Sequence, residues 1–424
     1  MIKKEYKHLN EIVYIMKLKS GMEVHILPKE DPCYSTYVEL SIPYGSLHLQ
    51  YKVGKEIKTT PPGTAHFLEH KIYAMPEGDA FQEFSNLGVD ANAMTSHNQT
   101  SYLFTATQNV IPALSHLLRM IDTPYFTDEN VEQEKLIIAE ELKMYLDDPN
   151  TVMQNRLLEN MYYVHPFRHD IGGTIESIQY ISKESLLDVY KHFYNPSNRL
   201  ITIAGKVDLD EIKKFFKEYD EKNPEKHKLP KIIFPKEPKR LCTRNETEVK
   251  NNGISKLLIG IKIKSVRQNA NLQIKREMAY TMMLNILLGP SSPMFDKLLK
   301  EKLINQSFSI QTNFEKNAEN ILIFAETKKV YILKKLLIHL FTEEAHLYLN
   351  EESFERYKKV YLGQVIFALN NIENKAYLHG KYYHMGSSLF DVVEILKLIT
   401  FEDVVATLES IQPKAISTLI HKKA

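Results

Sequence analysis

Three residues with metal-binding and acid–base chemistry lie close together in the segment Gly63–His70. His66, Glu69 and His70 stand at positions i, i+3 and i+4. On a helix that advances about 100° per residue, the imidazoles lie about 40° apart and the carboxylate about 60° to the other side, so all three share one face. Two imidazoles on adjacent turns can bind one zinc ion, and the carboxylate between them can reach a water molecule on that ion. The order His-x-x-Glu-His therefore predicts a zinc hydrolase of the inverzincin type.

Chance accounts poorly for this motif. With 16 histidines and at most 53 glutamates in 424 residues, it is expected about 0.08 times per chain. The alternative is a solvated helix face that carries two histidines and a glutamate and binds nothing. A second metal-like set, His339, Glu343 and His346, stands in a predicted helix over residues 330–349. Flanking leucines favour an amphipathic helix with a polar edge at that place.

A zinc hydrolase also needs a third protein ligand, and the predicted helix over residues 127–146 offers several glutamates. When Val131 is set at 0°, Glu134 falls near 300° and Glu141 near 280°, whereas Glu140 falls near 180°. The first two glutamates thus flank the expected apolar stripe, which consists of Val131, Ile138, Leu142 and Tyr145.

A carboxylate beside a buried stripe must find a partner or become protonated. Zinc would be such a partner, so we predict Glu141 as the third ligand and Glu134 as a second-shell carboxylate that supports it. The alternative is that both glutamates are rim carboxylates paired with lysines. The residues taken alone favour this second interpretation, and both remain open at this point.

The elements expected to position these side chains mix strands and helices without strict alternation, which predicts an α+β fold. Strands are predicted at residues 13–18, 24–27, 36–42, 91–95, 101–106, 200–204, 256–264, 321–326 and 415–420. Helices are predicted directly after Gly63 and at residues 79–86, 110–120, 127–146, 183–193, 273–288, 330–349, 353–369 and 401–411. Four prolines between residues 221 and 240 predict a linker. It separates a first domain, residues 1–220, from a second of similar element order, residues 241–424.

Composition excludes several classes of protein. With 54 basic against 53 acidic residues the net charge is +1, which gives no field for a nucleic acid partner. Two cysteines, Cys33 and Cys242, leave no disulfide framework beyond one bridge. No apolar run resembles a signal peptide or a membrane span, so we expect a cytoplasmic protein.

The chain resembles the insulinase/pitrilysin (M16) family of zinc peptidases, most closely its small bacterial YmfH-like branch. The resemblance rests on the His-Phe-Leu-Glu-His motif and, about 70 residues later, on Glu134-x6-Glu141 followed by residues 144–149. It covers the first half with high specificity and continues through residues 91–96, 173–178 and 194–198. In the second half it depends mainly on element order and on residues 291–295.

The resemblance implies two related domains, each a mainly antiparallel sheet packed against helices. It also implies one zinc ion per chain held by His66, His70 and Glu141, with Glu69 as the general base of a metalloendopeptidase. Family members enclose their site between domain halves, which restricts substrates to small or unfolded peptides.

The resemblance further implies how a peptide substrate is held. Asn92 and Ala93, on a predicted edge strand, would bind it in extended form by strand addition. Asn92 could equally be a turn residue.

One departure from the family concerns an arginine and a tyrosine, seven residues apart, that contact substrate in many relatives. An ungapped match from Ser291 places Leu299 and Gln306 at these positions, and Phe308 is the nearest aromatic residue. We therefore expect either a homodimer or a heterodimer with a paralogue that carries the missing pair. The alternative function is a non-catalytic or weakly catalytic subunit of such a complex, in peptide maturation or translation-factor modification.

Overall fold

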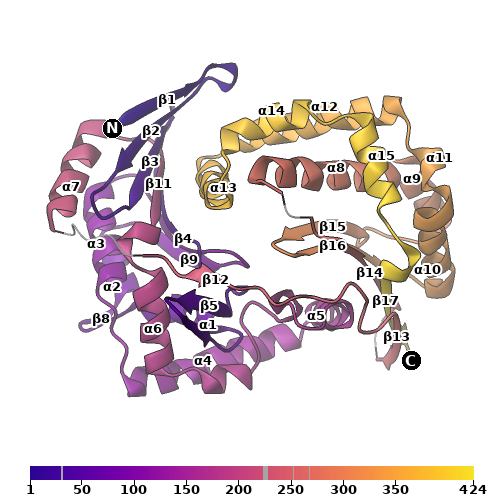
Figure 1. Ribbon diagram of the computed structural model, residues 1–424, viewed down its shortest axis with the longest axis horizontal. Coiled ribbons are helices and arrows are strands. Elements are labelled where there is room, and N and C mark those ends of the chain that lie inside the picture. The colour runs from indigo at the N-terminus through magenta and orange to yellow at the C-terminus, as the bar shows by residue number, and fades with distance from the viewer. Residues whose placement is uncertain (30–31, 223–227, 252, 267) are drawn as a thin grey trace. The chain divides into compact units, whose positions relative to one another are not determined.

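The computed structural model describes residues 1–29, 32–222, 228–251, 253–266 and 268–424 (Figure 1). Residues 223–227 of the predicted linker lie outside this set. The chain forms two compact units: unit 1 comprises Met1–Met144, Asp170–Ile233 and Phe367–Phe390, and unit 2 comprises Tyr145–His169, Phe234–Ile366 and Asp391–Ala424. In the described residues, no helix has both the length and the apolar character that a membrane span requires.

Unit 1 is built on a seven-stranded sheet with the order β1-β2-β3-β11-β4-β10-β9. Among the described residues of this sheet, only β3 and β11 pair in parallel. Its strands are β1 (Ile2–Tyr6), β2 (Glu11–Lys17), β3 (Glu23–Pro28), β4 (Thr36–Ile42), β9 (Asp90–Thr95), β10 (Thr100–Ala106) and β11 (Leu200–Gly205). A three-stranded sheet contains β5 (Gln50–Val53), β6 (Glu56–Thr59) and β12 (Lys231–Ile232). A two-stranded sheet contains β7 (Ala74–Met75) and β8 (Gly78–Asp79). The strand β9 lies at the edge of the large sheet, where the sequence predicts an edge strand.

Unit 2 contains a five-stranded sheet with the order β13-β17-β14-β16-β15. Its strands are β13 (Asn245–Lys250), β14 (Lys256–Ile263), β15 (Ser309–Glu315), β16 (Ala318–Glu326) and β17 (Ile416–Lys423). This order and these directions repeat those of the five strands β3-β11-β4-β10-β9 in unit 1, including the one parallel pair at the end of the set. The mainly antiparallel α+β class is confirmed, and the shared topology agrees with two related domains.

Helices cover both faces of the unit 1 sheet. Apolar side chains from alternate positions of β3 and β4, such as Ile26 and Leu40, form the larger core with residues of several helices. The helices of unit 1 are α1 (Thr64–Ile72), α2 (Ala80–Asn86), α3 (Val110–Asp122), α4 (Asp128–Leu146), α6 (Lys183–Phe193), α7 (Leu209–Lys222) and α13 (Ile372–Met385). Those of unit 2 are α5 (Pro149–Met161), α8 (Ala270–Leu288), α9 (Pro293–Lys300), α10 (Val330–His339), α11 (Ala345–Tyr348), α12 (Glu351–Ala368), α14 (Val392–Lys397) and α15 (Phe401–Glu409).

The two units differ from contiguous halves on either side of residues 221–240, because each contains one helix from the other half of the chain. The helix α5 packs on β14 and β17 of unit 2. It approaches β14 closely at Gly260, where a Cβ atom would lie 2.3 Å from Met161 Sδ. The helix α13 packs on β4 and β11 of unit 1.

Both apolar and polar contacts join α13 to the sheet of unit 1, and the apolar ones include Ala376 with Leu27 and Ala204. His379 Nε2 lies 2.7 Å from His25 Nδ1, and His384 Nε2 lies 2.8 Å from Ser41 Oγ. Lys375 Nζ donates to Glu11 at 2.7 Å. Burial lowers the pKa of His379 to about 3 and that of His384 to about 4, so both imidazoles are neutral near pH 7.

Two details of the sequence prediction are wrong. Tyr145 is 41% exposed and lies outside the buried stripe of α4, which consists of Val131, Lys135, Ile138, Ala139 and Leu142. The predicted helix over residues 330–349 is interrupted by a π-helical turn at Leu340–Glu344. Because this turn changes the angular spacing of residues, His339, Glu343 and His346 do not follow one regular helical face.

Candidate metal centre

The helix α1 begins at a tight junction between two loops. Gly63 has φ +91°, and a Cβ atom there would lie 2.4 Å from the carbonyl oxygen of Gly172. Gly173, with φ +78°, contacts Pro62 in the same way. The loop through residues 172–173 therefore fixes where α1 starts and which way its histidine-bearing face points.

We expect Gly63→Ala to lower the free energy of unfolding by about 2 kcal/mol or more, because it combines left-handed strain with a backbone clash. Denaturant-induced unfolding followed by circular dichroism measures this loss. Gly54→Ala is the matched control, since Gly54 also has positive φ (+60°) but nothing lies within 4 Å of its Cβ position. Equal losses in both variants would contradict the role of the junction.

The structure brings His66, His70 and Glu141 together. One possible ligand atom from each lies within 4.8 Å of the others, and the described residues form no other such group. His66 Nε2 lies 3.6 Å from Glu141 Oε1, and His70 Nε2 lies 3.5 Å from Glu141 Oε2. Both separations exceed an ordinary hydrogen bond. They approach the edge of about 3.3–3.5 Å that two ligands subtend on a tetrahedral zinc ion with bonds of about 2.0–2.1 Å.

The donor set fits zinc chemically as well as in size. Two imidazoles and one carboxylate leave a fourth position open, as catalytic zinc sites require. His66 Nδ1 is buried and, in the described part of the chain, has no hydrogen-bond partner. Its Nε2 faces Glu141.

The neighbouring glutamate Glu140 lies on a different face of α4. Its side chain is 73% exposed and pairs with Lys143 at 2.6 Å. The side chain of Glu141 is only 22% exposed. The helical rotation argued from the sequence thus corresponds to where these two carboxylates lie.

Glu134 contacts both the histidine face and a buried lysine. Its Oε1 accepts a hydrogen bond from His70 Nδ1 at 3.2 Å. The other ring nitrogen of His70, Nε2, faces Glu141. Its Oε2 accepts from Lys71 Nζ at 3.1 Å, and that lysine side chain is only 4% exposed. Glu134 therefore pairs with a lysine, as the alternative interpretation held, and also orients a histidine of the cluster.

Charges around the cluster displace the pKa values of the two histidines in opposite directions. Burial, followed by the neighbouring imidazole, lowers the pKa of His66 below its ordinary value. For His70 burial also acts downward, but the hydrogen bond and charge of Glu134 and the other carboxylates outweigh it and raise the pKa. Burial opposes ionisation of Glu134, yet its bonds to His70 and Lys71 prevail and lower its pKa.

Glu69 lies on α1 between the two histidines but outside the ligand group. It is 9% exposed, and Thr95 at the end of β9 donates a hydrogen bond to its Oε2. Burial raises the pKa of Glu69 above its ordinary value, although the bond from Thr95 acts in the opposite direction. A buried carboxylate beside a metal site is suited to accept a proton.

Sequence reasoning assigned no role to Lys71 or Thr95. Lys71 directly follows the motif, and Thr95 stands in the stretch 91–96 that resembles the family. The sequence shows that both residues lie in or beside the motifs, but not which side chains they contact. Lys71 meets Glu134 and Thr95 meets Glu69 only when α4 and β9 pack near α1 in the folded chain.

The predicted substrate-binding residues lie on β9. Asn92 is exposed and Ala93 half-buried. The Asn92 side chain accepts from the backbone N–H of Ala93 at 2.8 Å. In unit 2, Leu299 on α9 is 45% exposed, Gln306 is exposed, and the ring of Phe308 packs 6.0 Å from that of Phe295.

We expect Glu134→Gln to raise the zinc dissociation constant about 10–100-fold, because an amide orients His70 less firmly than a carboxylate. Competition with a chromophoric chelator measures this constant. Glu132→Gln is the matched control, since Glu132 on the same helix pairs with another buried lysine, Lys135, at 2.6 Å. If both variants bind zinc equally well, Glu134 does not support the cluster.

Two family models match the chain. The model described as Insulinase (Peptidase family M16) matches residues 29–175, and the one described as Peptidase M16 inactive domain matches residues 180–361. Over 412 residues the chain is 36% identical to the uncharacterized zinc protease YmfH of Bacillus subtilis (strain 168). This match covers 94% of each sequence. It is 28% identical over 217 residues to the mitochondrial-processing peptidase subunit beta of Saccharomyces cerevisiae, covering 49% of this chain and 46% of that one.

Solved structures include the same fold. An M16-like peptidase from Alicyclobacillus acidocaldarius superposes with a TM-score of 0.90 at 28% identity, covering 98% of this chain and 99% of that one. A protease from Helicobacter pylori superposes with a TM-score of 0.83 at 19% identity, covering 97% and 99%.

Proposed function

The chain belongs to the insulinase (M16) family of peptidases, and from that membership we propose that it is a zinc-dependent endopeptidase. Its substrates are small or unfolded peptides, cleaved within an enclosed chamber. Residues 1–220 supply the catalytic and metal-binding side chains, and residues 241–424 form a pseudo-repeat without the metal motif.

The observation that carries this proposal is the spacing of the three candidate ligands. The separations of 3.6 and 3.5 Å between Glu141 and the two histidines fit the edges of one zinc tetrahedron. A structural pairing of these side chains favours ordinary hydrogen-bond distances instead. The zinc protease names of related proteins support the same metal.

His66, His70 and Glu141 would hold the zinc ion, which would supply a Lewis acid for the peptide carbonyl and for water. Glu69 accepts a proton from the attacking water and returns it to the leaving amine. Thr95 orients Glu69 through its hydrogen bond to Oε2. Glu134 holds the proton on Nδ1 of His70, which keeps Nε2 as the ligand atom.

The edge strand β9 holds the substrate. An edge strand offers unpaired backbone groups to which a peptide can add as a further strand. Asn92 and Ala93 lie on this strand, which ends at the residue that bonds Glu69. A peptide bound along β9 is thereby led toward the catalytic carboxylate.

A second candidate is a weakly catalytic subunit of a heterodimer. Leu299 and Gln306 favour it, because they stand where many relatives carry the substrate-binding arginine and tyrosine. Neither side chain can replace the charge of an arginine or the phenol of a tyrosine. A paralogue with that pair would then complete the enzyme.

Metal removal and partner addition test both candidates. The full chain is expected to contain one zinc ion, to cleave an unfolded peptide, to lose cleavage when zinc is removed, and to regain it with one equivalent of zinc. Cleavage only after addition of a paralogue bearing the arginine–tyrosine pair would select the heterodimer. Absence of bound zinc, or cleavage that persists without it, would contradict the proposed function.

A further inference from the structure

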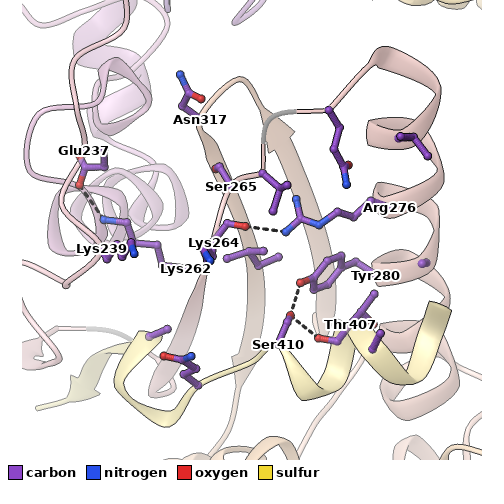
Figure 2. A pocket seen from close by; sticks show the side chains of 18 of the residues that line it. Glu237, Lys239, Lys262, Lys264, Ser265, Arg276, Tyr280, Asn317, Thr407 and Ser410 are labelled. Carbon is purple, nitrogen blue, oxygen red and sulfur yellow. Dashed lines mark hydrogen bonds and ion pairs between the residues drawn. The ribbon is translucent and has the colours of Figure 1, made fainter. Parts of the chain in front are cut away.

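A cavity of about 1010 Å³ lies within unit 2, and none of the candidate zinc ligands lines it. Most of its walls come from four segments: residues 234–239, the end of β14 with residues 262–266, α8 and residues 403–415. Gln268 and Asn317 add to the lining. Figure 2 shows Glu237 and Lys239 on one side of this cavity and Arg276, Tyr280 and Ser410 on the other. Its volume is at the upper end of the range for small-molecule pockets.

The lining is strongly basic. Seven of its side chains are lysine or arginine and two are acidic. Three of the seven are neutralised by carboxylates: Lys262 by Glu237 at 2.8 Å, Lys275 by Asp403 at 2.7 Å, and Arg276 by Glu319. Lys262 also donates hydrogen bonds to three backbone carbonyl groups, so its ammonium group is already occupied by contacts within the fold.

Four lysines of the lining remain uncompensated: Lys236, Lys239, Lys264 and Lys414. All four are exposed. Among the described residues, none of their ammonium groups has an ion-pair partner. The four lysines come from three separate segments of the wall. The positive charge is therefore distributed over the cavity and is not concentrated at one point.

An apolar strip accompanies this charge. Val266 and Leu272 are 48% and 49% exposed, and both line the cavity. A ligand that matches the whole cavity therefore carries apolar groups as well as several separated anionic groups.

The aromatic rings of the lining are already covered. Arg276 lies 5.4 Å from the ring centroid of Tyr280, and the Tyr280 hydroxyl bonds Ser410. The ring of Phe234 stacks on His165 with an interplanar angle of 7°. The lining therefore offers little aromatic surface on which a base could stack.

We propose that this cavity binds an acidic peptide segment, with its carboxylates on the four uncompensated lysines and its apolar side chains on Val266 and Leu272. The proposal goes beyond the proposed function, because binding here requires neither zinc nor cleavage.

Fluorescence anisotropy with the full chain tests this binding. The probe is a labelled hexapeptide of alternating glutamate and leucine, and the comparison peptide has glutamine in place of glutamate. The chain carries Glu69→Gln so that neither peptide is cleaved. We expect the glutamate peptide to bind about tenfold or more tightly than the glutamine peptide, and its affinity to fall as salt rises.

Charge reversal locates the site. Lys239→Glu combined with Lys264→Glu is expected to weaken binding of the glutamate peptide about tenfold or more. The matched control is Lys213→Glu with Lys214→Glu, two exposed lysines of α7 in unit 1. Circular dichroism establishes that both double variants are folded.

Three results would overturn the proposal. They are equal binding of the two peptides, equal losses in the cavity and control variants, and lysine-dependent binding of inorganic triphosphate that is tighter than that of the peptide. If the chain with Glu69 intact shows no zinc-dependent cleavage, the proposed function is contradicted, whereas peptide binding that depends on the cavity lysines would still support this inference.

Discussion

Glu69→Gln is expected to lower kcat for peptide hydrolysis by about 10²–10⁴-fold while the zinc content of the chain stays unchanged. Glutamine matches glutamate in shape, and its amide oxygen can still accept the hydrogen bond from Thr95. It cannot take a proton from water at neutral pH. Because Glu69 is not among the grouped ligand side chains, we expect all three ligands to remain in place in the variant.

Initial rates with an unfolded peptide, together with zinc analysis by mass spectrometry, measure both parts of this prediction. Glu140→Gln is the control, since it also removes one carboxylate near the motif but from an exposed position that pairs with Lys143. It is expected to keep both zinc and activity. Full cleavage by the Glu69 variant would refute its assignment as general base.

Glu141→Gln is expected to raise the zinc dissociation constant by about 100-fold or more, and to abolish zinc-dependent cleavage as a result. The substitution replaces an anionic ligand with a neutral amide while preserving size. The effect should exceed that of Glu134→Gln, because Glu134 acts through His70 rather than as a ligand.

Glu140→Gln again provides the comparison, one residue earlier on α4. Chelator competition on the two purified variants gives both constants. If Glu140→Gln loses more zinc than Glu141→Gln, the orientation of α4 and the choice of ligand are both wrong.

Local periodicity predicted the elements that carry the candidate site. The helix after Gly63, the long helix over residues 127–146 and the strand pair containing residues 91–95 all occur close to their predicted bounds. Their apolar residues recur at helical or strand spacing and pack into one core, so the pattern is sufficient to detect them.

The helix α13 escaped prediction because its buried face is polar or small. Lys375, Ala376, His379 and Gly380 are its buried residues. Ser41 on the sheet is a polar partner of this face, and a Cβ atom at Gly380 would lie 3.3 Å from Ser41 Oγ. Ile372 and Ala376 do pack in an apolar cluster with the sheet, but lysine, histidine and glycine lie between the apolar residues of the helix. The sequence therefore shows no continuous apolar stripe there, and the packing of α13 in unit 1 could not be predicted from it.

The roles of individual glutamates could be only partly predicted. The helical angle separated Glu140 from Glu134 and Glu141, because rotation on α4 is a local property. Whether the latter two meet lysines or histidines depends on how α4 lies against α1, which no local pattern encodes. Glu134 meets both kinds of partner, Lys71 and His70.

The central claim is that His66, His70 and Glu141 hold one zinc ion. An anomalous difference map from crystals of the zinc-loaded chain, recorded on both sides of the zinc absorption edge, tests it most directly. The account predicts one strong peak about 2.0–2.2 Å from Nε2 of both histidines and from a carboxylate oxygen of Glu141. A peak coordinated by other side chains, or no peak between these three residues, would contradict it.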